Sequence, residues 1–474
     1  MADALTSLNQ ILGEVADLQR SSELLEWDER VYMPPAAAAS HGEMTATLRK
    51  VAHEMFTSAE VGRLLDQAAL DVAGLDPDTD EVRLVRVASR DFRKAIQVPP
   101  EFVARHAQTV SAAQAAWATA REASDFAAFQ PHLEKVIDLK REYVAFFGKA
   151  DHPYDHLLDD YEPGLTTADV RHLLDGLRPR QVALLKAIRS RPQVDDAMLR
   201  AEYTEHGMLD FSVEVMTAFG FDWTRGRQDK SAHPFCSGTG PDDVRVTTRW
   251  VPTLPLSLVT GSMHETGHAL YEQGIDPRYA RSALRGGVSL GIHESQSRLW
   301  EKFVGQSEAF WSYFLPSLQR RFPRQLGDVT LPAFYRAVNK VEPSLIRIES
   351  DEATYNLHIM LRVELELALI EGTVEVRDLP RVWNEKMQEY LGIVPPNDAD
   401  GVLQDIHWSA GLFGYFATYT MGNVIAAQLW QRYGALQPGR DAAIARGDFS
   451  GLLQWLRTTL HHSGRKFTPQ GLLE

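Results

Sequence analysis

His264 and His268 stand four residues apart in the sequence, and Glu265 directly follows the first of them. Residues at this spacing lie on one face of a helix with their Cβ atoms about 5–6 Å apart, so both imidazoles can bind one metal ion. Imidazole nitrogens are common zinc ligands, and a carboxylate beside such a metal can take a proton from water. The pattern therefore predicts a zinc site at which Glu265 is the general base of a hydrolytic reaction.

The segment around these residues has the pattern of a helix. Leu256, Val259, Met263 and Leu270 recur at helical spacing, and Gly274 is a typical helix stop. The spacing predicts a helix over residues 256–274 with the metal-binding pattern in its middle.

A third ligand has to come from another part of the chain. The extended metzincin pattern requires glycine at position 271 and histidine at position 274, where this chain has Tyr271 and Gly274. Glu272 is two turns beyond His264, about 12 Å along the helix axis, which is too far for one ion. Glu294 is the better candidate, although a carboxylate there could instead stabilise the N-terminus of a helix. Spacing alone leaves both roles open.

Helical patterns dominate the rest of the chain. Thr166, followed by Asp169, predicts a capped helix start, and Ser350 is expected to open a helix that stops near Gly372. In residues 242–250 the β-branched residues Val244, Val246 and Thr248 stand at alternate positions, and residues 283–292 form a short segment that contains glycines. Both segments are expected to be strands. The expected fold class is mainly α, with a small β-sheet near the zinc helix.

Composition and charge exclude several classes of partner. The formal net charge is -15 at pH 7, which repels nucleic acids and anionic membrane surfaces. No apolar run approaches 18 residues, so no membrane span is expected, and the N-terminus lacks the basic and apolar regions of a signal peptide. The single cysteine, Cys236, fits a reducing compartment. We expect a cytoplasmic protein.

Six short segments in order carry a resemblance to a known family. They are HPF (233–235), DVRVT (243–247), HETGH (264–268), HESQ (293–296), IRIESDE (346–352) and GVLQDIHW (401–408). With these motifs the chain resembles the carboxypeptidase Taq family, helical metallocarboxypeptidases of the gluzincin type, along essentially its whole length. The chain departs from the family pattern at Ser350 and Ala417, where many relatives have alanine and proline, and neither is a metal or base position.

The resemblance implies that Glu294 is the third zinc ligand and that the activity is removal of single residues from peptide C-termini. It also implies one catalytic domain over residues 1–474, a long-helix body with a deep groove and the zinc at its floor, and a homodimer. Zinc is the expected cofactor, one ion per chain, although cobalt or manganese also suits two histidines and a glutamate.

A carboxypeptidase has to hold the free α-carboxylate of its substrate, and Arg347 is the first candidate for this contact. The structural alternative for Arg347 is a salt bridge with Glu349 or Asp351. His233 is the second candidate, and its alternative is a buried histidine with satisfied hydrogen bonds.

Four further residues are candidates for a role near the metal. Arg245 shares a strand face with Asp243, so it either orients substrate or pairs with that aspartate, and the pairing is favoured. Tyr419 and His407 are the candidates for stabilising the oxyanion of the tetrahedral intermediate, and Tyr415 competes with Tyr419.

Two other functions fit the same pattern. A metallo-oligopeptidase that cuts peptides internally can use the same zinc motif in a helical groove. A peptide-binding protein with a relict metal site is the non-enzymatic alternative, but it has no use for the base Glu265.

Overall fold

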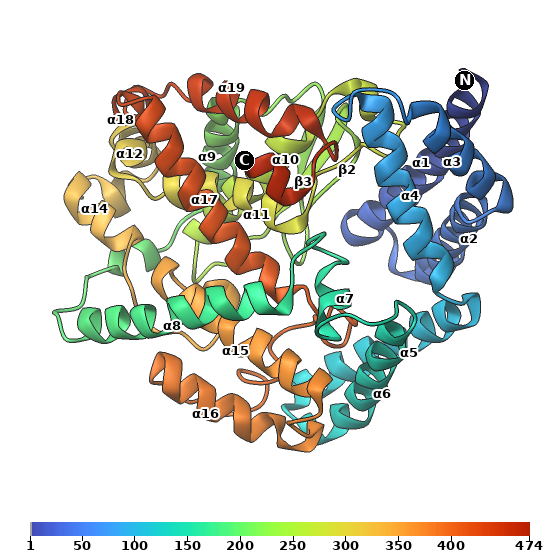
Figure 1. Cartoon of the computed structure of the whole chain (residues 1–474). Helices are drawn as coiled ribbons and strands as arrows, with labels where there is room; N and C mark the ends of the chain where they lie inside the picture. The colour runs from blue at the N-terminus through green and yellow to red at the C-terminus, as the bar shows by residue number, and fades with distance from the viewer. Residues whose placement is uncertain (1) are drawn as a thin grey trace.

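The computed structural model of the chain describes residues 2–474, most of which lie in helices (Figure 1). The long helices are α1 (Ala2–Val31), α2 (Ala38–Phe56), α4 (Asp80–Gln97), α5 (Pro100–Ala123), α6 (Phe126–Ala145), α8 (Thr167–Arg189), α10 (Leu256–Glu272), α15 (Glu352–Glu371) and α17 (Phe416–Leu436). The shorter ones are α3 (Ala59–Val72), α7 (Tyr154–Leu158), α9 (Glu205–Phe219), α11 (Leu290–Arg298), α12 (Glu308–Arg321), α13 (Pro323–Leu326), α14 (Leu331–Val338), α16 (Leu379–Leu391), α18 (Arg440–Ile444), α19 (Ser450–Thr459) and α20 (Pro469–Leu473). This architecture confirms the mainly α fold class.

A small sheet of three strands packs against α10. Its strands are β1 (Gly226–Lys230), β2 (Cys236–Gly240) and β3 (Asp243–Thr248), in the order β1-β3-β2. The central strand β3 pairs parallel with β1 and antiparallel with β2. Val244 and Val246 of β3 are fully buried and cluster with Ala269 of α10, as the alternation over 242–250 predicts. The small sheet expected beside the helix of the metal pattern, α10, is therefore confirmed.

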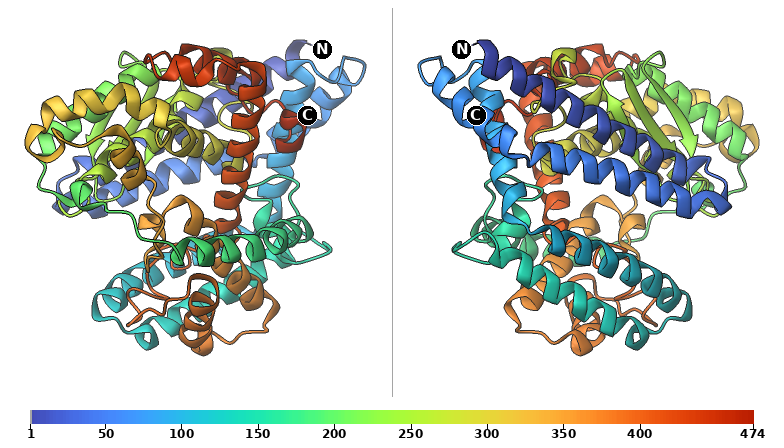
Figure 2. Two further views of the ribbon diagram at one scale, coloured as in Figure 1. Left: turned by 90° about the vertical axis from the view of Figure 1, so that its left-hand side faces the viewer. Right: turned by 90° about the vertical axis from the view of Figure 1, so that its right-hand side faces the viewer.

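The helices enclose two large hydrophobic clusters. One is built mainly on α1, α3, α4, α9, α10, α12 and α19, and the other on α5, α6, α7, α8, α15 and α16. Helix α17 contributes residues to both, and Figure 2 shows it descending from the upper group of helices to the lower one. The side chains on α17 and on the helices it touches, α11 and α15, therefore lie where the two clusters meet.

The expected strand over 283–292 is wrong. Residues 283–289 form turns and bends, and α11 begins at Leu290 with the Ser289 side chain accepting a hydrogen bond from the Ile292 N–H. The backbone of this segment bonds to other parts of the chain: the Arg465 N–H donates to Leu284 O, and the Leu290 N–H donates to Tyr161 O. Among residues 2–474, no strand lies beside this segment to form a ladder with it, and its apolar residues pack as part of a loop.

The helix caps agree with the sequence in one case and differ by one residue in the other. Thr166 and Asp169 form the capping box at the start of α8. At α15 the cap is Asp351, whose side chain accepts from the N–H groups of Ala353 and Thr354, while the Ser350 hydroxyl donates to Arg347 O. The helix ends before Gly372 as expected. No helix within residues 2–474 has the length and apolar character that a membrane crossing requires.

Candidate metal centre

Close packing of three helices brings the predicted metal ligands together. His264 and His268 lie in the middle of α10, whose apolar residues Met263 and Leu270 are fully buried. A Cβ at Gly267 would lie 2.5 Å from Gln296 O of α11, and a Cβ at Gly422 of α17 would lie 2.6 Å from Glu294 Cγ. Since any larger residue at either position would push the helices apart, Gly267 sets how near α11 lies to α10, and Gly422 sets how near α17 lies to α11.

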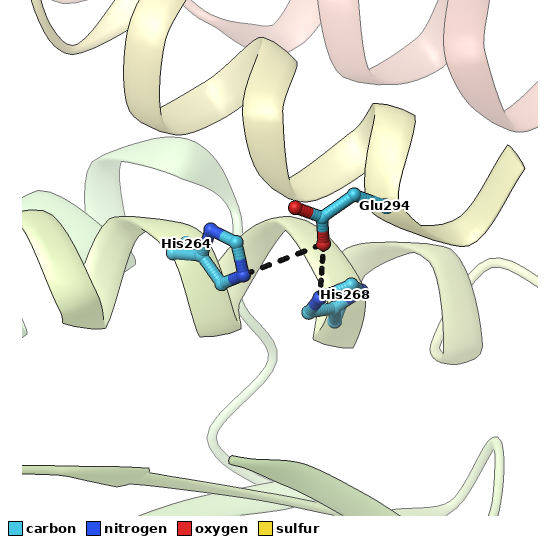
Figure 3. A group of neighbouring side chains, drawn as sticks. All are labelled: His264, His268 and Glu294. Carbon is cyan, nitrogen blue, oxygen red and sulfur yellow. Dashed lines mark ion pairs between the residues drawn. The ribbon is translucent and has the colours of Figure 1, made fainter. Parts of the chain in front are cut away.

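Glu294 points at both histidines (Figure 3). Its Oε2 lies 3.6 Å from His264 Nε2 and 3.4 Å from His268 Nε2. One ligand atom from each of the three residues lies within 4.8 Å of the others. Ligand atoms of a tetrahedral zinc ion with bonds of about 2.0–2.1 Å are themselves about 3.3 Å apart. The cluster has the dimensions of a zinc site.

The electrostatics of the cluster favour a cation. The second oxygen of Glu294, Oε1, is buried and has no hydrogen-bond partner among the described residues, and buried carboxylate oxygens seldom stay without one. Burial alone would lower the pKa of His264, but the carboxylates of Glu294 and Glu301 raise it to about 9. The site therefore has a negative potential and an unsatisfied oxygen, and its residues fit a divalent metal ion.

The carboxylate of Glu301 contacts Nδ1 of His264, the ring nitrogen that does not face Glu294. Glu301 lies in the π-helix Leu299–Val304 that continues α11, and its Oε2 is 2.9 Å from His264 Nδ1. Arg298 Nη1 and Lys302 Nζ also contact this carboxylate, at 2.9 and 3.0 Å. Such carboxylate partners fix the tautomer and orientation of a ligating histidine.

Replacing Glu301 by glutamine is expected to weaken metal binding by about 10- to 100-fold, the usual effect of losing such an outer partner. The change leaves all three ligands in place but removes the charged acceptor for His264 Nδ1. Chelator competition measures the metal dissociation constant, and Glu308→Gln, at an exposed position in the first turn of α12, is the control. Equal metal affinity in the Glu301 variant and the unmodified protein would show that His264 is oriented by packing alone.

His268 is supported by a longer chain of contacts. Its Nδ1 lies 2.6 Å from His293 Nδ1, and His293 Nε2 lies 2.7 Å from Glu272 Oε1. If the His293 Nε2–H donates to Glu272, then His293 Nδ1 accepts from the His268 Nδ1–H, which leaves the His268 Nε2 lone pair for the metal. Glu272, too distant to be a ligand, therefore orients a ligand through His293.

Glu265 lies on α10 directly beside His264 with a carboxylate that has no hydrogen-bond partner among the described side chains. Its side chain is nearly buried, with 6% exposed. Burial raises the pKa of Glu265 to about 7. A base with a pKa near the working pH, and not engaged by protein donors, is suited to accept a proton from water.

Arg347 is buried, with 5% exposed, in a pair with Asp405. Its Nε and Nη2 donate to Asp405 Oδ1 at 3.0 and 2.8 Å, and its Nη1 donates to Tyr355 OH at 3.0 Å. The expected alternatives Glu349 and Asp351 are therefore wrong as its partner. Arg362 donates to the other oxygen of Asp405 at 2.6 Å, so two arginines share one carboxylate and leave a local excess of positive charge.

The aromatic candidates gather beside this pair. His407 Nε2 lies 3.2 Å from Tyr419 OH, and Arg347 lies 5.0 Å from the centre of the Tyr419 ring. Burial lowers the pKa of His407 to about 3, so its imidazole is neutral. The Tyr415 ring lies 5.4 Å from the ring of Tyr419 and 5.3 Å from that of His407. Both tyrosines and His407 stay candidates for the oxyanion donor.

His233 and Arg245 lie in different surroundings. His233 is exposed, with its Nδ1 2.9 Å from Pro234 O, so it is not the buried histidine of the structural alternative. It lies near enough to His407 to affect the pKa of that residue. Arg245 donates to Asp243 at 2.8 and 2.9 Å and lies 4.3 Å from the ring of Trp27, so its contacts join β3 to α1.

Glu366 fixes the loop that leads from His407 to Tyr415. This fully buried carboxylate accepts hydrogen bonds from Tyr154 OH at 2.5 Å, the Gly414 N–H at 2.9 Å and Trp408 Nε1 at 3.0 Å. Burial nevertheless raises its pKa from 4.5 to about 7.

A carboxyl group whose pKa is higher in the folded than in the unfolded chain destabilises the fold as it ionises. The free energy of unfolding is expected to fall between about pH 4.5 and 7 through Glu366, on the order of a few kcal/mol. Urea unfolding at several pH values measures this slope, which Glu366→Gln is expected to reduce. An unchanged slope in the variant would assign the pH dependence to other groups.

The sequence interpretation missed several residues that contact the candidates, namely His293, Glu301, Tyr355 and Arg298, and it considered Glu272 only as a ligand. Glu301 stands seven residues after Glu294, two helical turns along the same face, and that spacing could have indicated it. Tyr355 and Arg298 gave no comparable signal, because their contacts depend on how α15 packs against α11.

Known proteins resemble this chain over almost its whole length. The family model described as carboxypeptidase Taq (M32) metallopeptidase matches residues 7–474. Thermostable carboxypeptidase 1 from Thermus thermophilus is 38% identical over 481 residues, which cover 99% of this chain and 94% of that protein. Carboxypeptidase 1 from Bacillus subtilis is 35% identical over 465 residues, covering 98% and 92% of the two chains.

The fold agrees with these matches. The crystal structure of an M32 carboxypeptidase from Deinococcus radiodurans superposes with a TM-score of 0.96 at 39% identity, covering 99% of this chain and 94% of that one. Such agreement in sequence and fold over nearly the whole length confirms the resemblance of the six motifs. The chain belongs to the carboxypeptidase Taq (M32) metallopeptidase family.

Proposed function

We propose that this protein is a zinc-dependent metallocarboxypeptidase that releases single amino acids from the C-termini of peptides. The observation that carries the proposal is the convergence of His264, His268 and Glu294 within 4.8 Å. Beside them, Glu265 has a carboxylate without a protein partner, and burial raises its pKa to about 7. A purely structural metal site has no use for such a base.

A divalent cation held by these three residues supplies Lewis-acid polarisation of the scissile carbonyl and lowers the pKa of water. Glu265 accepts a proton from the attacking water and then donates it to the leaving amino group. Glu301 and His293 keep the two histidines in the orientation that the reaction requires.

The positively charged group around Asp405 supports recognition of a C-terminal carboxylate. Arg347 and Arg362 share that single aspartate, so the excess charge attracts an anionic group. We assign the carboxylate contact to Arg347, with the exposed His233 as a second contact on the substrate. Arg245 pairs with Asp243, which supports the structural role over the proposed contact with substrate.

Tyr419 or Tyr415 is proposed to donate a hydrogen bond to the oxyanion. Replacing the donor by phenylalanine is expected to lower kcat by about 100-fold, the usual effect of removing one such donor. Steady-state kinetics of Tyr415→Phe and Tyr419→Phe identify the donor, and the exposed Tyr313→Phe is the control. If both site variants keep full kcat, neither tyrosine is the donor.

Timed mass spectrometry of an unblocked peptide tests the proposed reaction. Products that lose one C-terminal residue at a time, stopped by chelator and restored by zinc, cobalt or manganese, are the expected result. The same peptide with an amidated C-terminus is expected to resist cleavage. Internal fragments would favour the metallo-oligopeptidase, and no cleavage with any metal would favour the peptide-binding protein.

We further propose that the protein acts on unstructured peptides in the cytoplasm as a homodimer, without nucleic-acid or membrane partners. The net charge of -15 supports the exclusion of anionic partners. Light scattering during size-exclusion chromatography is expected to give twice the chain mass of 53.2 kDa. A mass equal to one chain would contradict the dimer.

A further inference from the structure

Another cavity borders the π-helix Leu299–Val304, apart from the cluster of His264, His268 and Glu294. Its volume is about 400 Å³, within the range of small-molecule sites. Residues of α8, α15 and α17 and the segment 338–341 at the end of α14 form its other walls. Helix α15 packs against α8 and against α17, and Figure 1 shows the three helices together. Lys340, within that segment, is already paired with Asp196 and Glu342. None of the functions assigned above uses this cavity.

One side of the cavity has an excess of buried positive charge. Arg298, with 5% exposed, and Lys302 both line it. Both cations pair with the carboxylate of Glu301, which also contacts His264 Nδ1. Because a buried guanidinium and a mostly covered ammonium group share a carboxylate that is already engaged by His264, an additional anion next to them would be stabilised.

Both cations keep donors for such an anion. Arg298 Nε donates to Asn423 Oδ1 at 2.6 Å, and Arg298 Nη1 donates to Glu301 Oε2 at 2.9 Å. Its Nη2 donates to no other described residue, so it is available to a ligand. Lys302 has three N–H donors, and Glu301 takes one of them. A carboxylate is an anion with two oxygens that can accept from two such donors.

A carboxylate that is available to a cation also lines the cavity. Glu352, in the first turn of α15, is exposed and makes no hydrogen bond or ion pair with another described residue. Its neighbour Asp351 is occupied by capping the helix. Glu352 is near enough to Arg298 to contribute to the raised pKa of that guanidinium, so the two opposite charges belong to one cavity.

The remaining wall is largely apolar. Leu177 and Leu184 of α8, Phe303 of the π-helix and Val424 of α17 line it. A ligand that matches all these features carries a carboxylate, an ammonium group and an aliphatic side chain.

We propose that this cavity binds a free aliphatic α-amino acid, with its carboxylate on Arg298 and Lys302 and its ammonium group on Glu352. That such a ligand is also a product of the enzyme rests on the proposed function, but the binding itself does not. Arg298 holds Glu301, which orients His264, so the bound amino acid and the metal centre share one guanidinium. The site is therefore placed to couple product concentration to metal-ligand orientation.

Isothermal titration of the zinc-loaded full chain with L-leucine tests the site. Leucine is expected to bind, while leucinamide, which lacks the carboxylate, and 4-methylpentanoate, which lacks the ammonium group, bind at least about tenfold more weakly. Leucine binding is expected to persist after the metal has been removed by chelator. Loss of all binding on chelation would overturn the proposal, because it would place the amino acid on the metal.

Two variants locate the ligand without changing the metal ligands or Glu265. Glu352→Gln is expected to weaken leucine binding by about tenfold or more, and Glu308→Gln, which removes the same charge from the first turn of α12, is expected to leave it unchanged. Ala427→Phe, at an exposed position on the cavity wall, is expected to block binding sterically. Unchanged leucine affinity in both Glu352→Gln and Ala427→Phe would overturn the site even if the enzyme is an active carboxypeptidase.

Discussion

Glu265→Gln is expected to lower kcat by about 10³-fold or more while the protein still binds one metal ion per chain. Glutamine has nearly the shape of glutamate but accepts no proton, so the variant loses the general base and keeps the packing of α10. The three ligand side chains belong to other residues, so metal content is expected to stay the same. Steady-state kinetics on a short peptide, together with metal analysis of the same sample, measures both quantities.

Glu265→Asp is the control that separates charge from position. It retains a carboxylate but withdraws it by one methylene from its place beside His264, so its kcat is expected to lie between those of the unmodified enzyme and Glu265→Gln. An active Glu265→Gln enzyme would show that another group takes the proton. Loss of both metal and activity would indicate that Glu265 helps to form the metal site.

Glu294→Gln is expected to weaken metal binding by more than about 100-fold and to abolish activity at ordinary metal concentrations. Changing an outer partner of a ligand usually costs 10- to 100-fold in metal affinity, and loss of a charged ligand is expected to cost more. Burial opposes ionisation of Glu294, but His264 and His268 lower its pKa to about 2, so the carboxylate is fully charged near neutral pH. The neutral amide removes that charge and preserves the side-chain volume packed against Gly422.

Chelator competition and activity as a function of added zinc measure this effect. Ser297→Ala removes a 3.0 Å hydrogen bond to Glu294 Oε2 and keeps the carboxylate, so it is expected to have a much smaller effect on metal affinity. High concentrations of zinc are expected to restore part of the activity of Glu294→Gln. Equal affinity in Glu294→Gln and the unmodified protein would assign the third ligand to another residue.

The position of the metal pattern could be read from sequence because a helix is a local structure. His264 and His268 are brought together by the periodicity of α10 alone, and the prediction over 256–274 agrees with the helix Leu256–Glu272. Strand β3 could be predicted from the sequence for the same reason, since the alternation of Val244 and Val246 is a local pattern. The other two strands, β1 and β2, could not be predicted from the sequence, because they form by pairing with β3. In addition, β1 is a polar segment without apolar alternation.

Local signals failed where long-range contacts decide the conformation. The residues 283–289 have the composition of a strand, but their backbone bonds to distant parts of the chain and forms a loop. Arg347 has acidic residues two and four positions away, yet it pairs with Asp405, 58 residues further along the chain. In each case the nearest residues in sequence are not the nearest in space.

The sequence by itself therefore determined the helical class from periodicity along the chain and placed two candidate metal ligands and a candidate base on one helix, since their spacing is local, while the motifs indicated the family and Glu294. Only the tertiary structure decided that Glu294 meets both histidines, that Glu301 and His293 orient them, and that two arginines share Asp405 near Tyr419. These contacts depend on how closely α10, α11, α15 and α17 pack. That packing is set by glycines and buried side chains on different helices, whose joint effect has no signature at any single position of the chain.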